Sequence, residues 1–515
     1  MSSSAASNEC VDLLIVGGGI NGVGIARDAA GRGHKVLLVE QSDLASATSS
    51  ASTKLIHGGL RYLEQFEFRL VHEALVERER LLAIAPHIIR PMQFIVPHVP
   101  GLRPRWQIRA GLFLYDHIAT RVRLSASKAV KLNSPPFAGT LKAHMRHGFS
   151  YADCWVDDSR LVVLNAMDAA QRGATIRTRT QFIDGVIENG RWQVRLKDQN
   201  SGSIYTALAR TLINAAGPWV EDVLHRLPGI HNRAQVRLVK GSHIVVPRLY
   251  DGEHAFLLQH PDGRIVFTIP YEREFTVIGT TDVPCDEPPG NVAISPDEIE
   301  YLCRTVNEYF ERQISAEDVR WTYAGVRPLS DDEAANASKV TRDYKLELIA
   351  EDGEPPLLSI FGGKITTYRR LAESALSKLH PHIGGAKQTW TDLAPLPGGD
   401  LPHDDFEAFV NGVRRRWSFL PNDLARRLSH AYGTRISDIV GAARNFDDLG
   451  VHFGAGLTRA EVDYLRSHEW AQTVEDILWR RTKLGLHISA EGRAELARYV
   501  GEPATPQTSL RVEAG

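Results

Sequence analysis

The pattern of hydrophobic and polar positions is clearest at the start of the chain, between Val11 and Glu40. An apolar run, Leu13 to Val16, leads into a glycine cluster and then into a run of small residues with amphipathic spacing. A second apolar run, Val36 to Val39, ends on the acidic Glu40. The pattern predicts a buried strand, a tight turn, a helix and a second buried strand.

Later segments predict a second sheet and a helical tail. Apolar residues recur at helical spacing from Arg69 to about Ala85 and from Pro296 to Phe310. Between these helices, Val236 to Val239 and His243 to Val246 are among several short apolar runs that predict an antiparallel sheet. From about Leu401 to Gly501, helices rich in Arg, Glu and Trp predict a separate domain with no evident chemistry of its own.

Composition narrows the class of protein. The 515 residues are enough for several domains, and 60 Lys and Arg against 62 Asp and Glu give a formal net charge of −2, so no basic field favours nucleic acid. Four scattered cysteines without a C-x-x-C pair predict neither a disulfide framework nor a metal site, and hence a reducing compartment. No apolar run approaches ~18 residues and no signal-peptide pattern occurs, so we expect neither a spanning segment nor a leader.

The glycine cluster has the spacing G-x-G-x-x-G. Gly17 permits the tight turn, Gly19 lets the backbone approach a pyrophosphate, and Gly22 lets the helix pack on the strand. The pyrophosphate would lie at the helix N-terminus, where free N–H groups favour an anion. The carboxylate of Glu40 would bind ribose hydroxyls and repel a 2′-phosphate, which predicts FAD or NAD. A flexible glycine loop, or a fold that has lost its cofactor, are the alternatives at this point.

Three separated segments place cations beside glycines or turns. These are His57 with Arg61, Arg327 with Arg342, and Lys364. Each alone is more often a solvated surface charge. Beside a bound dinucleotide, however, a cationic pocket predicts a small anionic substrate.

The segment from Leu102 to Leu124 interleaves aromatic and basic residues. One interpretation is an ordinary amphipathic helix that packs against the core. The other is a surface that lies on anionic lipid. The residues concerned are Trp106, Phe113, Tyr115, Arg103, Arg105, Arg109, Arg121 and Arg123.

Several motifs together resemble one family, the FAD-dependent glycerol-3-phosphate dehydrogenases, and most closely its bacterial respiratory, homodimeric members. The motifs are GGGINGVGIARDAA, SSASTKLIHGGLRYLE, FSYADCWVDDSRL, NAAGPW, KGSHIVVPR, IGTTDV, GVRPL and FGGKITTYRRLAE. The resemblance covers nearly all of residues 10 to 500. EF-hand loops and a cysteine-rich tail, which other branches of the family carry, do not occur in the sequence, and this points to the aerobic bacterial type.

The resemblance implies an α/β fold with an FAD-binding Rossmann-like domain of the glutathione-reductase/D-amino-acid-oxidase type, an inserted antiparallel-sheet substrate cap and a helical C-terminal domain. The expected FAD-binding domain comprises 10–65, 148–220 and 321–385, and the cap 66–147 and 221–320. The helical domain is expected at 395–501, between flexible tails at 1–9 and 502–515.

The implied reaction is oxidation of sn-glycerol 3-phosphate to dihydroxyacetone phosphate by hydride transfer to N5 of FAD, with electrons passing on to ubiquinone. The implied enzyme is a cytoplasmic homodimer bound peripherally to the inner face of the cytoplasmic membrane. Alternatives are an oxidase that passes the electrons to O₂, an amine or amino-acid oxidase of the same fold, and a cofactor-free binding protein.

Chemistry and resemblance together suggest roles for single residues. His57 is the first candidate for the base that removes the C2 hydroxyl proton, because an ordinary imidazole pKa near ~6.5 suits neutral pH. Lys364 is the second candidate base, but it is better suited to favour negative charge on the flavin. Arg327 is placed in both the catalytic and the substrate-binding set. The other expected substrate contacts are Arg61, Tyr62, His243 and Arg342.

The expected cofactor contacts come from the first turn, the polar strip that follows it, the NAAGPW motif and the second glycine turn. They are Gly17, Gly19, Asn21, Gly22, Glu40, Thr48, Ser49, Ser50, Lys54, His57, Gly58, Gly59, Ala216, Gly217, Gly363, Lys364, Thr366 and Thr367. No metal ligand is expected.

Overall fold

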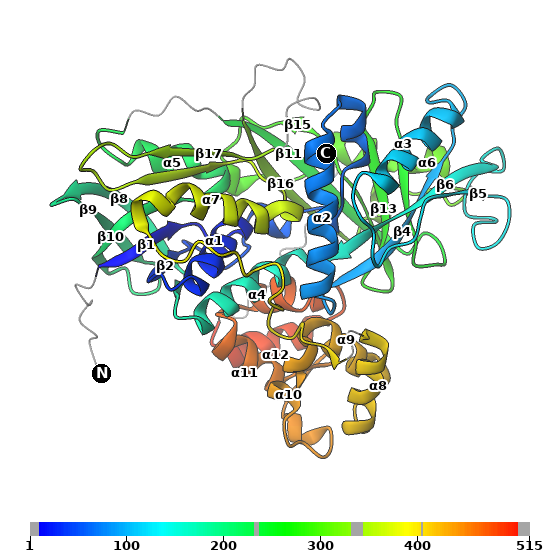
Figure 1. The fold of residues 1–515 in the computed structure, drawn as a ribbon. Helices are drawn as coiled ribbons and strands as arrows, with labels where there is room; N and C mark the ends of the chain where they lie inside the picture. The colour runs from blue at the N-terminus through cyan, green and yellow to red at the C-terminus, as the bar shows by residue number, and fades with distance from the viewer. Residues whose placement is uncertain (1–9, 231–235, 331–342, 403–404, 503–515) are drawn as a thin grey trace.

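A computed structural model describes residues 10–230, 236–330, 343–402 and 405–502. Two large sheets and a helical region make up the described chain. In Figure 1 the sheet that contains β1 lies at the left, the sheet that contains β4 and β13 at the right, and the C-terminal helices below both. Among the described residues, no helix is both long enough and apolar enough to cross a bilayer.

The first sheet has eight strands and is parallel at its centre. Val11–Val16 (β1) pairs in parallel with Val36–Val39 (β2) and with Ile204–Asn214 (β10), as expected for strands buried on both faces. Helices Ile20–Gly31 (α1), Asp158–Gln171 (α4) and Tyr368–Ile383 (α7) pack together with it. The remaining strands are β7 (Thr175–Arg177), β8 (Thr180–Glu188), β9 (Arg191–Asp198), β17 (Lys345–Ile349) and β18 (Leu357–Phe361).

The second sheet has ten strands in the order β15-β11-β14-β13-β12-β4-β6-β3, with β16 on β11 and β5 on β6. Its bounds are β3 (Leu55–Ile56), β4 (Ile89–Pro97), β5 (Lys128–Lys131), β6 (His147–Val156), β11 (Val236–Pro247), β12 (Ala255–Gln259), β13 (Ile265–Tyr271), β14 (Phe275–Gly279), β15 (Val283–Pro284) and β16 (Trp321–Ser330). Helix Pro296–Tyr309 (α6) packs on it, and a reciprocal Ser295–Glu298 capping box begins this helix.

Most predicted elements are confirmed, and one prediction is wrong. Helix Phe68–Ile84 (α2) and α6 lie where the helical spacing indicated. The runs at 236–239 and 243–246, however, belong to one strand, β11. Polar residues interrupt the apolar pattern between them, but the backbone stays paired with β16 without a break from Val236 to Val245.

The two sheets do not follow the chain in simple blocks. The expected domain boundary at residue 148 falls within β6, which pairs with β4 in the ten-stranded sheet. Likewise β16, from the segment expected in the FAD-binding domain, pairs with β11. The domain division given above therefore stays a prediction, while the strand order is an observation.

Helix Arg105–His117 (α3) has apolar residues on two sides. Ile108, Leu112 and Tyr115 are buried at helical spacing, as the core-packing interpretation expects. On the other side Trp106 is 73% exposed and Phe113 is 57% exposed. Tyr115 must be removed from the lipid-facing set, because it is 2% exposed and its hydroxyl donates to Asp153 (2.8 Å).

Buried ion pairs join the C-terminal region to α4 and to the turn between β7 and β8. Arg160 of α4 pairs with Glu469, and Arg179 pairs with Asp476 (2.7 Å). The region comprises α8 (Phe406–Arg416), α9 (Asn422–Tyr432), α10 (Ile436–Val440), β19 (His452–Gly454), β20 (Leu457–Thr458), α11 (Arg459–His468), a π-helix (Asp476–Arg481) and α12 (Ala490–Val500).

Candidate cofactor and substrate site

Three glycines shape a cavity at the N-terminus of α1: Gly17 and Gly19 line it, and Gly22 packs against the backbone of Gly17. Gly17 has φ +114°, and a Cβ there would overlap the carbonyl oxygen of Ala215. A Cβ at Gly22 would overlap the carbonyl oxygen of Gly17, and one at Gly19 would lie 3.1 Å from the Ser49 hydroxyl. We call Gly17, Gly19 and Gly22 the glycine wall. It leaves room for a ligand to approach the backbone closely, as a pyrophosphate requires.

Glu40 lies at the end of β2, beside this wall. Its Oε2 accepts from the backbone N–H of Gly18 (2.7 Å), and its Oε1 accepts from that of Ser42 (2.9 Å). Burial raises the pKa of Glu40, and these two hydrogen bonds oppose that rise. Because each carboxylate oxygen can accept a second hydrogen bond, the side chain can also bind ribose hydroxyls.

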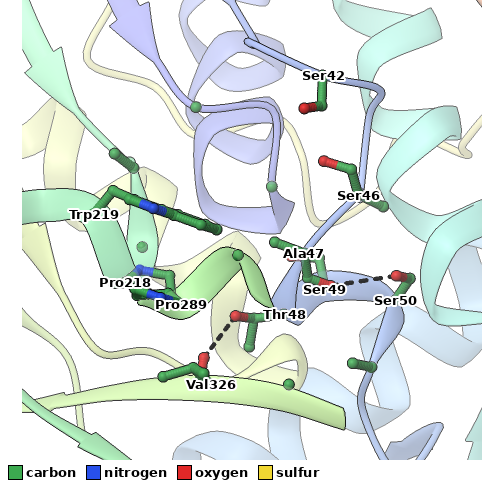
Figure 2. Close-up of a pocket in the computed structure, with 18 of the residues that line it drawn as sticks. Ser42, Ser46, Ala47, Thr48, Ser49, Ser50, Pro218, Trp219, Pro289 and Val326 are labelled. Carbon is green, nitrogen blue, oxygen red and sulfur yellow. Dashed lines mark hydrogen bonds between the residues drawn. The ribbon is translucent and has the colours of Figure 1, made fainter. Parts of the chain in front are cut away.

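The cavity has a volume of about 590 Å³, within the usual range for cofactor sites. Figure 2 shows Trp219 extending toward it from one side and the strip Ser42–Ser50 on the other. Two neighbouring side chains fix the strip near its C-terminal end: Ser49 Oγ accepts from Ile20 N (3.0 Å), and Thr48 Oγ1 donates to the carbonyl of Val326 in β16 (2.6 Å; Figure 2). The expected residues that line it are Gly17, Gly19, Asn21, Glu40, Thr48, Ser49, Ser50, Ala216, Gly217 and Gly363.

Lys54 was expected to contact the cofactor, but in the structure it lies behind the cavity lining. Its Nζ is buried in an ion pair with Asp158 (3.0 Å) and donates to the carbonyl of Ser50 (3.0 Å). Burial lowers the pKa of Lys54, and Asp158 acts in the opposite direction. Lys54 therefore supports the strip from outside the cavity.

His57, Tyr62 and Lys364 come together although about 300 residues separate the first from the last. The backbone N–H of His57 donates to Thr366 Oγ1 (3.2 Å), and Lys364 Nζ lies 3.7 Å from the centre of the Tyr62 ring. Gly59, with φ +79°, leaves the space that Tyr62 fills.

Other expected residues near this point are structural or lie apart from the cavity lining. Gly58 N–H donates to the Tyr115 hydroxyl (2.8 Å), and Thr366 and Thr367 are buried in the 3-10 turn Ile365–Thr367 that precedes α7. Arg61 lies in the 3-10 helix Leu60–Gln65, next to Tyr62. Arg342 lies outside the described residues.

A second group of expected residues lies on paired strands of the ten-stranded sheet. His243 of β11 lies opposite Tyr323 of β16, and their rings stack at 4.6 Å and 11°. His243 Nε2 is 3.0 Å from Thr53 Oγ1. Arg327, two residues along the same face from Gly325, contacts Asp282 and donates to Thr280 Oγ1 (2.9 Å). We call His243, Tyr323 and Arg327 the cap-sheet cluster.

The cap-sheet cluster depends on two glycines that sequence reasoning did not single out. A Cβ at Gly241 would overlap the Arg327 guanidinium, and one at Gly279 would overlap the His243 ring. Burial lowers the pKa of His243 well below its usual value, and the nearby cations Arg327 and Lys54 lower it further. The imidazole is therefore neutral at physiological pH.

The interpretation of the C-terminal domain must be revised. Four of its residues, Glu475, Trp479, Arg480 and Lys483, line the same cavity as the glycine wall. The helical pattern of that tail gave no sign of this role, because the contact depends on how the domain docks. Trp219 and Trp321 are further lining residues that the expected set omitted, although Trp219 belongs to the NAAGPW motif.

No group of three or more His, Cys, Asp or Glu side chains among the described residues could hold a metal ion. The arrangement instead offers a cavity that suits a dinucleotide. Cationic side chains lie on elements bordering that cavity.

Comparison with known proteins identifies families that match this chain. The model described as FAD dependent oxidoreductase matches residues 12–369, and that of the C-terminal domain of alpha-glycerophosphate oxidase matches residues 389–503. Glycerol-3-phosphate dehydrogenase of Pseudomonas aeruginosa is 52% identical over 96% of each chain. The aerobic glycerol-3-phosphate dehydrogenase of Escherichia coli is 48% identical, over 98% of this chain and 99% of its own.

Two further relatives bear on substrate and cofactor. D-erythritol 1-phosphate dehydrogenase of Brucella abortus is 49% identical over 96% of this chain and 98% of its own. Among solved structures, the glycerol-3-phosphate dehydrogenase of Bacillus halodurans complexed with FAD superposes with a TM-score of 0.74 at 26% identity, covering 96% of this chain and 89% of that one.

Proposed function

Because the chain belongs to the FAD-dependent glycerol-3-phosphate dehydrogenase family, we propose that it oxidises the C2 hydroxyl of sn-glycerol 3-phosphate to the ketone of dihydroxyacetone phosphate. The observation that carries the proposal is the meeting of His57, Tyr62 and Lys364 next to Gly363, which lines the dinucleotide cavity. The residues present fit FAD, since Gly17 and Gly19 line the cavity without side chains that would keep a pyrophosphate away from the backbone, and Glu40 is placed for a ribose. Bound FAD supplies the acceptor for the hydride that leaves C2.

Loss of hydride gives a ketone only if the C2 hydroxyl also loses its proton, so a base is needed. His57 is our proposed base, because its backbone is fixed by Thr366 at the second glycine turn. Lys364 supplies a fixed positive charge above the Tyr62 ring. That charge favours negative charge that develops nearby during the reaction.

Arg327 is our principal candidate for binding the substrate phosphate, with Arg61 and Arg342 in support. A planar guanidinium matches phosphate oxygens in pairs, which an ammonium does not. The contacts of Arg327 with Asp282 and Thr280 fix the plane of that group. His243 lies on the neighbouring strand as a neutral hydrogen-bonding group.

The decisive experiment is anaerobic addition of sn-glycerol 3-phosphate to the yellow holoprotein while the flavin absorbance is followed. We expect rapid bleaching with glycerol 3-phosphate and none with glycerol. Absence of bleaching with the phosphate ester would overturn the proposal. Because a 49%-identical relative is named for D-erythritol 1-phosphate, that ester is the comparison substrate, and faster bleaching with it would reassign the substrate to the longer polyol.

We also propose that the electrons pass on to ubiquinone rather than to O₂. Turnover with a soluble quinone analogue and little peroxide would support this, whereas stoichiometric peroxide would identify an oxidase. The homodimer that the resemblance implies is a further proposal. Sedimentation of the holoprotein at twice the mass of one chain would support it.

A quinone acceptor dissolves in the bilayer, so we propose that the enzyme binds the inner face of the cytoplasmic membrane through α3. Trp106, Ala110, Phe113 and Leu114 form an exposed stripe on this helix, and Arg105 lies beside it. Phe66, which is 79% exposed, follows Glu64 in the chain, and Glu64 pairs with Arg103 just before α3 (2.5 Å). Exposed aromatic rings next to basic residues suit the interface of an anionic membrane.

Co-sedimentation with anionic vesicles tests this surface. Trp106→Ser with Phe113→Ser should abolish pelleting but leave activity with a soluble dye acceptor intact. Arg103 is left unchanged, because its pairing with Glu64 holds α3 in place. Val186→Ser, which removes an apolar side chain 44% exposed on β8, is the matched control. Pelleting that persists in the double variant would place the lipid contact elsewhere.

A further inference from the structure

The C-terminal helical domain reaches the cofactor cavity, and we propose that it forms part of the FAD-binding site, with Trp479 as the positioning residue that closes the cavity. Trp479 lines the cavity together with residues of the glycine wall and of β16. It belongs to the π-helix Asp476–Arg481. Such helices are rare and often mark functional sites.

Several contacts fix the Trp479 ring. Its indole stacks on Trp321 with ring centres 4.4 Å apart and planes at 22°. A Cβ at Gly485 would overlap the indole, so the glycine leaves space for the ring. Lys483 has φ +59°, and its Nζ donates to the carbonyl of Trp479 (2.9 Å) and to Ser159 Oγ (2.5 Å). These contacts hold the ring in place before any ligand binds.

The stack continues into the cap-sheet cluster. The ring centres of Trp321 and Tyr323 are 5.0 Å apart, and those of Tyr323 and His243, which stack, are 4.6 Å apart. Trp479, Trp321 and Tyr323 all line the cavity, and they belong to two different parts of the chain. A row of rings thus connects the C-terminal domain to the side chains proposed to bind substrate.

A second set of contacts attaches the C-terminal domain to the strip on the other side. Asp43 is buried and accepts from Arg480 Nε (2.6 Å) and from both terminal nitrogens of Arg481 (2.8 Å each). Asp43 follows Glu40 closely in the strip that leads to Thr48 and Ser49. Breaking a buried pair of this kind leaves a charge without compensation, so undocking the domain would disturb the strip.

A ligand that contacts both the FAD-binding fold and the C-terminal domain binds the docked state more tightly than the undocked state. By linkage, FAD then stabilises docking, and docking raises the affinity for FAD. If the domain were only an attached structural unit, FAD would leave its internal stability unchanged. The two cases differ in a measurement on the apoprotein that needs no substrate.

The test compares Trp479→Ala and Trp479→Phe with Trp470→Ala, which removes another half-buried tryptophan of the same domain that does not line the cavity. FAD is titrated into each apoprotein. We expect Trp479→Ala to raise Kd about tenfold, Trp479→Phe to restore most of the loss, and Trp470→Ala to change Kd by less than about twofold. The flavin absorbance band should shift in Trp479→Ala alone.

Hydrogen exchange on the wild-type protein gives an independent readout if a variant does not fold. FAD should slow exchange at residues 476–483 but leave residues 406–416 of α8 unchanged. Equal effects of Trp479→Ala and Trp470→Ala on Kd would overturn the proposal, as would exchange at 476–483 that is indifferent to FAD. Failure of the glycerol 3-phosphate assignment would alter neither measurement.

Discussion

The glycine wall and the cap-sheet cluster, which reaches the same cavity through Tyr323, are built in opposite ways. The glycine wall is shaped by atoms that are missing, since a Cβ at Gly17 or Gly22 would overlap a backbone oxygen. The cap-sheet cluster is shaped by side chains that are present, and Arg327 and His243 each fill space that a facing glycine leaves. The first should be sensitive to added volume and the second to changed charge.

The largest expected effect is the loss of FAD binding when a side chain is added at Gly22. A Cβ there would overlap the carbonyl oxygen of Gly17, so α1 would have to move away from β1. We expect Gly22→Ala to bind no FAD and to lose about 1–3 kcal/mol of unfolding free energy, as overpacked sites do. Gly111→Ala in α3 is the matched control, because no atom lies within 4 Å of its added Cβ. Retention of flavin by Gly22→Ala would show that the turn can relax.

The second largest expected effect is on substrate turnover, when the planar guanidinium of Arg327 is replaced by an ammonium. Arg327→Lys keeps the positive charge but removes the planar pair of donors, so we expect kcat/KM for glycerol 3-phosphate to fall by roughly 100-fold, ~3 kcal/mol. Oxidation of unphosphorylated glycerol, if measurable, should change little. Arg195→Lys, at an exposed arginine that also pairs with an aspartate, is the control. An unchanged KM in Arg327→Lys would remove this residue from the phosphate site.

The same contrast explains how much the sequence could predict. The glycine wall lies within one short segment, where spacing, flanking strands and Glu40 all occur in local order, and the structure has these elements in place. The meeting of His57 with Lys364 could only be inferred from family resemblance, because it depends on contacts across most of the chain. The cavity-lining role of Trp479 has no local signal, since stacking on Trp321 is a consequence of domain docking.

Glu40→Gln combines features of the two regions. It changes charge, as Arg327→Lys does, but on the side of the cavity that the glycine wall shapes. The amide oxygen replaces only one carboxylate oxygen, so one of the backbone N–H groups of Gly18 and Ser42 loses its acceptor, and the charge-assisted bond to ribose is lost as well. We expect FAD Kd to rise about tenfold, ~1.5 kcal/mol, without an effect on KM for the phosphate ester. Glu188→Gln, at the exposed end of β8, serves as control. Unchanged FAD dissociation would show that Glu40 does not bind the ribose.

The smallest expected effect is on the pH dependence of stability, to which His243 of the cap-sheet cluster contributes and the glycine wall does not. Burial, reinforced by Arg327 and Lys54, lowers the pKa of His243 in the folded protein well below its usual value. Below pH ~6.5 the unfolded chain therefore binds a proton at this position that the folded protein does not bind, so His243 makes stability fall as pH decreases. Above that pH the contribution is constant.

His243→Asn removes this titration while keeping a polar side chain on β11. Between pH 7 and pH 5.5 the unfolding free energy of the wild type should fall by about 1 kcal/mol more than that of the variant. The other buried histidines with lowered pKa values, His87, His254 and His430, occur in both proteins and cancel in the difference. Denaturant unfolding of the apoproteins at both pH values measures the change, with His452→Asn at an exposed position as control.

Parallel pH curves for wild type and His243→Asn would contradict this prediction. They would mean that the imidazole becomes charged within the folded cap-sheet cluster, and hence that this cluster tolerates a third cation beside Arg327 and Lys54.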